Sequence, residues 1–82
     1  MTIATQPTAE EEAAFSVVQE DEIDVIFRSR TAEVHITHIE TGMVASSITH
    51  PVASMNYDAA MQNLRVQVAN ARRALWYAQK RE

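Results

Sequence analysis

The chain of 82 residues contains no cysteine, a single glycine and only two prolines. Without cysteine it cannot form disulfides, thiolate metal sites or cysteine nucleophiles, and this absence fits a reducing compartment. One glycine cannot build a glycine-rich phosphate-binding loop. No apolar run approaches the roughly 18 residues that a membrane span requires, and the start lacks the basic and apolar regions of a secretory signal. We therefore expect a cytoplasmic protein that does not enter a membrane.

Charge is unevenly distributed along the chain. Residues 1–24 contain seven acidic residues and no Lys or Arg, whereas residues 25–82 contain seven basic and four acidic residues. The composition of residues 1–21 predicts an acidic, flexible leader, although Thr8 and Glu11 also fit a capping box for a short helix. The mildly basic remainder falls short of the strongly basic footprint that is typical of nucleic-acid-binding domains.

Residues 22–82 are expected to form one small α+β domain, because a chain of this size buries only one core. Alternating apolar residues predict strands over residues 23–28, 34–39 and 43–48. Gly42 would supply the positive φ of the turn before the third strand. A periodicity of 3.6 residues then predicts a helix over Tyr57–Gln79, with Asn56 as its N-cap. The simplest arrangement is a three-stranded antiparallel sheet with one long C-terminal helix packed on one face, in the order β-β-β-α.

The predicted helix carries two lines of side chains. An apolar stripe is expected to face the sheet, formed by Tyr57, Ala60, Met61, Leu64, Val68, Ala71, Leu75 and Ala78. Basic and aromatic residues follow an outward-facing line, formed by Arg65, Arg72, Arg73, Trp76 and Lys80. Arg and Trp are enriched at binding hot spots and suit stacking and phosphate contacts on RNA. With Arg28 and Arg30 from the junction of the first two strands, these residues form the candidate binding set. The alternative is that Trp76 folds back onto the sheet edge or the leader and that the arginines are solvated.

The uncovered face of the sheet is a second candidate interface. If the helix covers the alternate positions from Ile23 to Phe27, with Val34 and Ile36, the other face is open. The residues that then point outward are Ile26, His35, Thr37, Ile39 and Met43. An apolar strip of this kind indicates a protein partner, a self-dimer or cover by the N-terminal segment. The open strand edges also allow strand addition.

The sequence predicts no metal, cofactor or small-molecule substrate. His35 and His38 are three residues apart in a predicted strand, so their side chains point to opposite faces and cannot share a metal ion. The acidic leader lacks a spaced Ca²⁺ ligand loop, and no serine lies in a recognisable arrangement with a base. We therefore expect that the protein is not an enzyme.

Two segments carry a family resemblance: VHITHIETGMVASS at residues 34–47 and MNYDAAMQNLRVQV at residues 55–68. They resemble the catalytic domain of bacterial class-I peptide chain release factors and of the related ribosome-rescue peptidyl-tRNA hydrolases. In that family a V-R-I-T-H strand leads to a T-G turn, a short I-V-V strand and a helix that begins N-K-x-x-A-M-x-x-L. The matching residues are Val34, Ile36, Thr37, His38, Thr41, Gly42, Val44, Asn56, Ala60, Met61 and Leu64. The preceding IDVIFRS is similar to the family's D-x-x-F-R-S strand, so the resemblance covers most of the chain and implies the same fold.

The chain departs from that family where the family performs its chemistry. There, the first strand runs into a loop with Gly-Gly-Gln, whose glutamine reaches the peptidyl-tRNA ester. Here only Arg30, Thr31 and Ala32 separate Ser29 from Glu33. The family's strand arginine is replaced by histidine, and the loop over residues 49–54 has no Arg, Lys or Gln. The resemblance thus implies a domain of this kind without its hydrolytic loop.

Two classes of function are therefore open. The first is a non-catalytic binding protein that acts on the translation machinery: the ribosome, ribosomal RNA or a translation factor. The second is a protein–protein inhibitor or adaptor, for example a viral one, that reuses the scaffold against a host protein. The acidic leader and the low basicity favour the second class. Homodimerisation is compatible with both.

Overall fold

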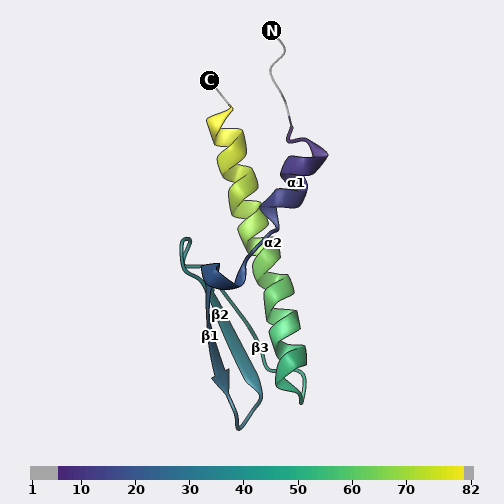
Figure 1. Cartoon of the computed structure of the whole chain (residues 1–82), viewed down its shortest axis with the longest axis vertical. Helices are drawn as coiled ribbons and strands as arrows, with labels where there is room; N and C mark the ends of the chain where they lie inside the picture. Colours follow the sequence, from purple (N-terminus) through teal and green to yellow (C-terminus); the bar gives the residue numbers. More distant parts are fainter. Residues whose placement is uncertain (1–5, 81–82) are drawn as a thin grey trace.

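The computed structural model describes residues 6–80, so the first five residues of the predicted leader and residues 81–82 lie outside the described part. Its elements are α1 (Ala9–Phe15), the short 3-10 helix η1 (Glu20–Glu22), β1 (Ile23–Arg28), β2 (Glu33–His38), β3 (Val44–Ser47) and α2 (Ala53–Gln79). The strands form one antiparallel sheet in the order β1-β2-β3, and α2 packs on one face of it (Figure 1). The predicted α+β fold with its β-β-β-α order is confirmed.

The core lies between the centre of the sheet and the first half of α2. Successive side chains of a strand point to opposite faces, and the inward residues of β2, Val34, Ile36 and His38, are buried. Ala45 of β3 lies opposite Ile36 and is also buried. From the helix, Ala60, Met61, Leu64 and Val68 belong to the cluster, and Val18 from the segment between α1 and η1 completes it.

The strand β1 lies outside the cover of α2. Val25 and Phe27 are on the helix side of the sheet, because they pair with the buried residues Ile36 and Val34. They are nevertheless 45% and 54% exposed, since α2 packs against β2 and β3. The expectation that the helix covers Val25 and Phe27 is wrong, and β1 is an edge strand with both faces open.

The helix α2 begins earlier than its periodicity predicts. It starts at Ala53 instead of Tyr57, so Asn56 lies in the first turn and does not serve as the N-cap. The N-cap position is Val52, whose side chain makes no capping hydrogen bond. The prediction failed because the Asn56 side chain is fully buried, and a buried amide needs hydrogen-bond partners. It finds them in the neighbouring loops and not in the N–H groups of its own helix.

The Asn56 side chain fastens the start of α2 to two loops. Its Oδ1 accepts hydrogen bonds from the Ser47 hydroxyl (2.9 Å) and the His50 backbone N–H (3.0 Å). Its Nδ2 donates to the backbone carbonyls of Ala32 (2.7 Å) and His50 (2.9 Å). The amide therefore joins the β1–β2 turn, the end of β3 and the loop before α2.

Two turn residues adopt positive φ angles. Gly42 has φ 73°, as predicted, and Ala32 has φ 57°. The left-handed conformation costs an alanine about 1–2 kcal/mol. Because the Ala32 carbonyl accepts a hydrogen bond from Asn56, that contact helps to hold the short β1–β2 turn in its unfavourable conformation.

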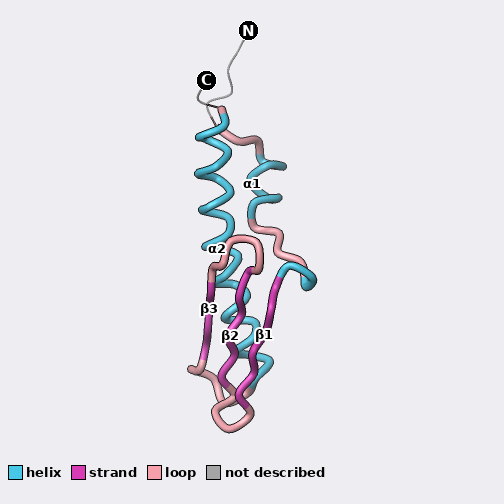
Figure 2. The backbone as a smooth tube through the Cα atoms, turned by 90° about the vertical axis from the view of Figure 1, so that its left-hand side faces the viewer, coloured by secondary structure: helices cyan, strands magenta, loops and turns pink. Residues whose placement is uncertain are grey.

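The helix α2 is about twice as long as the sheet. Its 27 residues rise about 40 Å, whereas the six-residue strands span about 20 Å. The predicted apolar stripe is buried against the sheet only as far as Val68, and Leu75 is 57% exposed. Beyond Val68 the buried residues are Ala69 and Trp76, in the half of α2 that α1 accompanies (Figures 1 and 2).

The leader is folded where a flexible segment was expected. Thr8 and Glu11 form the capping box that starts α1: the Glu11 N–H donates to Thr8 Oγ1 (3.2 Å), and the Thr8 N–H donates to Glu11 Oε1 (3.1 Å). A helix of seven residues is too short to be stable alone. It is formed here because it packs against α2, so residues 8–21 differ from the flexible leader that was expected for residues 1–21.

We predict that Asn56→Ala lowers the free energy of unfolding by about 2–3 kcal/mol, because it leaves buried backbone groups without partners. Urea unfolding followed by circular dichroism measures this change. Asn63→Ala is the matched control, since Asn63 is exposed on the same helix, and it should change stability by less than about 0.5 kcal/mol. Equal stabilities of the two variants would show that the Asn56 contacts are not important.

Candidate binding site on α2

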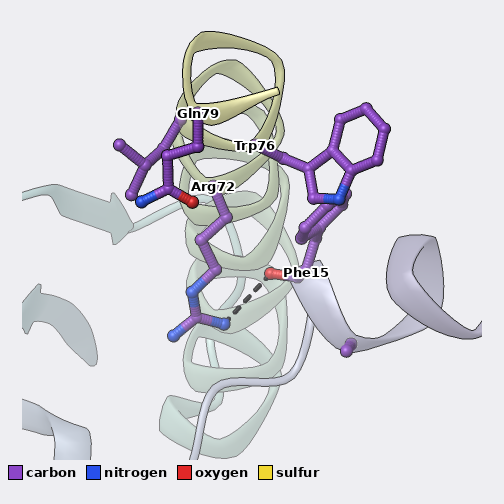
Figure 3. Close-up of a pocket in the computed structure, with 6 residues that line it drawn as sticks. Phe15, Arg72, Trp76 and Gln79 are labelled. Carbon is purple, nitrogen blue, oxygen red and sulfur yellow. Dashed lines mark hydrogen bonds between the residues drawn. The ribbon is translucent and has the colours of Figure 1, made fainter. Parts of the chain in front are cut away.

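Arg72 donates hydrogen bonds to the end of α1 and to the segment that follows it. Its Nη1 donates to the backbone carbonyls of Phe15 (3.1 Å) and Val17 (2.6 Å), and Figure 3 shows the first of these bonds. Its Nη2 donates to Glu22 Oε1 (3.3 Å). One guanidinium therefore holds the C-terminal end of α1 and η1 together.

Arg73 binds the leader through a forked ion pair. Its Nε (3.0 Å) and Nη2 (2.7 Å) donate to the carboxylate of Glu12, and its Nη1 donates to Asn70 Oδ1 (2.9 Å). The guanidinium carbon also lies 5.9 Å from the centre of the Phe15 ring, within range of a cation–π contact. Bidentate pairs of this kind fix orientation as well as adding energy.

Trp76 is the buried anchor of this surface. The residue is only 8% exposed, and its Nε1–H donates to Glu11 Oε2 (2.6 Å). The Lys80 ammonium lies 5.8 Å from the centre of the indole ring, and Tyr77 meets the ring edge-on. We call Arg72, Arg73, Trp76 and Lys80 the leader-binding face.

The carboxyl groups that the leader-binding face holds have pKa values below the ordinary value, through bonds within the leader as well as bonds from α2. The pKa of Glu11 lies below its ordinary value because the carboxylate accepts hydrogen bonds from the Thr8 backbone and from Trp76. The pKa of Glu12 is lowered by its hydrogen bonds from Arg73. The pKa of Glu22 is lowered by a bond from the Gln19 backbone and by the charge of Arg72. The three groups are therefore charged at neutral pH.

A shallow groove runs along the junction of α1 and α2. It has a volume of about 340 Å³ and is lined by Ala14, Phe15, Arg72, Leu75, Trp76 and Gln79 (Figure 3). The exposed Leu75 and the half-buried Phe15 make its walls largely apolar, and Arg72 supplies a charge. The site therefore combines an anion-binding surface with an apolar groove.

The structure brings together only part of the candidate binding set. Arg72, Arg73, Trp76 and Lys80 gather at the C-terminal half of α2, where they contact the leader or one another. Arg28 and Arg30 lie at the β1–β2 turn, beside the opposite end of α2 (Figure 1). The Arg28 side chain is 66% exposed, with its Nε 3.6 Å from Glu33 Oε1. The seven residues therefore do not form one continuous surface.

The partners of the leader-binding face were not predicted as site residues. The sequence shows Glu11, Glu12 and Glu22 only as acidic residues near the start of the chain. That Trp76 folds back onto the sheet edge or the leader is the alternative to a binding site, and the structure has it on the leader. The one signal that could have found them is the capping box, because it predicts a short helix that carries Glu11 and Glu12. The pairing of each carboxylate with an arginine depends on the angle at which α1 packs on α2. That angle cannot be read from the sequence.

The second candidate interface is only partly exposed. Ile26 and Ile39 are 58% and 57% exposed, whereas His35 and Thr37 are half-buried. His35 Nε2 lies 2.8 Å from Glu33 Oε2. Met43 packs against the core cluster, so its prediction as an outward-facing residue is wrong. The turn before β3 directs it inward, in register with Ala45.

No metal centre or membrane span is found within residues 6–80. No three His, Asp or Glu side chains of this part lie close enough together to hold a metal ion. None of its helices is both long and apolar enough to cross a membrane. His38 is buried, with Nδ1 2.8 Å from Thr41 Oγ1, and His35 lies on the other face of the sheet, as the strand alternation predicts.

The arrangement on α2 offers groups that can bind anions and stacked rings. Guanidinium groups take carboxylates or phosphates in the same forked geometry, and an indole ring with a neighbouring ammonium suits stacked partners. Comparisons of the chain with protein-family models, with curated proteins and with solved structures find no match.

We predict that acid releases the leader. Because the pKa values of Glu11 and Glu12 are lowered in the folded chain, their contribution to docking is complete above the ordinary value of 4.5 and is lost as the pH falls through the lowered values. Trp76 is the only tryptophan, so its fluorescence should shift to longer wavelength in this range. The measurement is an emission spectrum as a function of pH.

The double variant Glu11→Gln/Glu12→Gln tests the assignment. Glutamine keeps the capping box but removes both charges, so the Trp76 emission should be shifted already at pH 7. Glu10→Gln is the matched control, because Glu10 is exposed on the same helix. If the double variant keeps the wild-type emission and transition, the carboxylates do not hold the leader.

Proposed function

We propose that the chain is a non-catalytic binding protein that acts on the translation machinery, and that its leader-binding face takes RNA phosphates in place of the leader. One observation carries this proposal: the face already binds three carboxylates, those of Glu11, Glu12 and Glu22. A surface that fits carboxylates through Arg72 and Arg73 also fits phosphates. The leader then acts as an internal competitor for the same groups.

The aromatic part of the face adds a second contact of the kind that RNA offers. Phe15 lies over Arg73 in the docked leader, and an unstacked base fits the same position on a guanidinium plane. Trp76 with Lys80 provides a further stacking surface. A tethered leader has an effective concentration in the millimolar range, so only a partner with several charges replaces it.

The class of partner follows from the resemblance. The residues from Val34 to Leu64 resemble the release-factor catalytic domain, which works in the ribosome. The loop that carries the glutamine there is reduced here to a tight turn of four residues, 29–32, between β1 and β2. A turn of this length cannot extend to a distant ester bond, so the proposal has no hydrolytic step. We also propose that the protein acts in the cytoplasm.

The second candidate function is a protein–protein inhibitor or adaptor that uses the same face. The observation that favours it is the form of the bound leader: α1 is an acidic helix whose Phe15 lies against an apolar groove. An acidic amphipathic helix of another protein would make the same contacts. Helix-in-groove recognition of this kind is common.

We predict that Glu11→Gln/Glu12→Gln raises the affinity for single-stranded RNA and for ribosomal subunits. If the leader leaves the face free in about a tenth of the molecules, the gain is about tenfold. Fluorescence anisotropy at a low salt concentration of about 50 mM measures it, and the affinity should fall steeply as salt is added.

Arg72→Ala in this double variant should reduce RNA binding, whereas Arg65→Ala should do so much less. Both arginines lie on α2, but Arg65 is exposed and lies outside the leader-binding face. Failure to bind RNA at low salt contradicts the first function. Salt-tolerant binding of an acidic helical peptide by the same variant would then support the second.

A further inference from the structure

The open edge of β1 is a surface that the proposed function does not use. In the sheet order β1-β2-β3, both β1 and β3 are outer strands. β3 has only four residues, and the Val44 carbonyl accepts a hydrogen bond from Gln67 Nε2 (3.2 Å). β1 has six residues, and no strand of the described chain pairs with its outer edge. An edge of this length is a template for pairing with another strand.

The backbone groups that point away from the sheet can be assigned from the ladder. The Ile39 N–H donates to the Glu22 carbonyl (3.0 Å), and hydrogen-bonded and non-hydrogen-bonded pairs alternate along an antiparallel ladder. The backbone N–H and C=O groups of the even-numbered residues of β1 therefore point toward β2. The N–H and C=O groups of Val25 and Phe27 point to the open edge. The Ile23 N–H is already bonded to the Glu20 carbonyl.

The side chains of β1 are exposed on both faces. Val25, Ile26 and Phe27 are 45%, 58% and 54% exposed, so the edge strand has exposed apolar side chains on both faces of its centre. Asp24 and Arg28 flank Ile26 on the outer face of the sheet, and both are exposed. The strand thus carries an acidic residue, an apolar centre and a basic residue in a symmetric arrangement.

We propose that two copies of the chain pair through β1. The strands run antiparallel about a two-fold axis at Ile26, so that Asp24 of each copy lies opposite Arg28 of the other and Val25 lies opposite Phe27. Val25 and Phe27 form the hydrogen-bonded pairs, which use the backbone groups that point to the open edge. Asp24 and Arg28 form the closer, non-hydrogen-bonded pairs, in which side chains interact best.

Other registers match the two strands less well. Even-numbered residues of one copy must lie opposite even-numbered residues of the other, and odd-numbered opposite odd-numbered. A shift of the pairing by one residue would place the side chains of one copy on the opposite face of the joined sheet. Centring the axis on Val25 places Asp24 opposite Ile26. Centring it on Phe27 places Arg28 opposite Ile26. Only the axis at Ile26 pairs charge with opposite charge and apolar with apolar residues.

The pairing also explains why β1 lies outside the cover of its own helix. Two three-stranded sheets joined at β1 form one continuous sheet, with both α2 helices on the same face and Val25 and Phe27 of both copies between them. The apolar residues that a single copy leaves open on that face then pack across the two-fold axis. This surface is separate from the leader-binding face, so the proposal does not depend on RNA binding.

Analytical ultracentrifugation of the full chain tests the proposal. The mass should rise with concentration from 9.2 kDa toward twice that value. Asp24→Arg alone and Arg28→Asp alone should each weaken dimerisation by about tenfold or more, because like charges then face each other twice. An equimolar mixture of the two single variants should form heterodimers. One variant then carries arginine at both positions and the other carries aspartate at both, so both cross-strand contacts join opposite charges.

The double variant Asp24→Arg/Arg28→Asp should dimerise like the wild type, because it restores both pairs in reverse. Circular dichroism checks that each variant is folded, and amide exchange at Val25 and Phe27 should slow as the dimer forms. A mass of 9.2 kDa at concentrations up to about 1 mM would overturn the proposal. Single variants that dimerise as well as the wild type would do so too.

Discussion

The difference in length between α2 and the sheet determines most of the structure. The helix extends about 40 Å, because its 27 residues each rise about 1.5 Å, and the strands cover only about half of that distance. The first half of α2 buries its apolar stripe on β2 and β3. The second half has no sheet beneath it, and it is covered by the leader instead.

The two halves of α2 are held by different kinds of interaction. The sheet half depends on apolar contacts around Ile36 and Leu64, both fully buried, and on the amide of Asn56. The leader half depends on charged hydrogen bonds whose side chains are partly open to solvent: Arg72 and Arg73 are 27% and 34% exposed. Exposed ion pairs contribute little and are screened by salt. These contacts of the second half are therefore weaker than the apolar contacts of the sheet half, and the proposed exchange of the leader for a partner requires this difference.

The position of α2 over β2 and β3 has a further consequence at the β1 edge of the sheet. It leaves β1 with apolar residues on both faces and free backbone groups along its edge. The proposed binding surface on α2 and the proposed pairing surface on β1 thus arise from the same packing. A dimer through β1 would carry two leader-binding faces on one side of a joined sheet, and bivalent binding would strengthen the attachment to a repetitive partner such as RNA.

The sequence by itself determined the three strands, the helix α2 and their order. Alternation of apolar residues marks the strands, the 3.6-residue period marks α2, and Gly42 and the Thr8–Glu11 capping box mark two local conformations that the structure has. These are properties of neighbouring residues, so a short window of sequence contains them. Tertiary structure alone decided that Asn56 is buried, that Met43 turns inward, that Val25 and Phe27 stay open, and that Trp76 meets Glu11. Each of these depends on which surface lies over which, and that follows from the lengths and crossing of elements far apart in the chain.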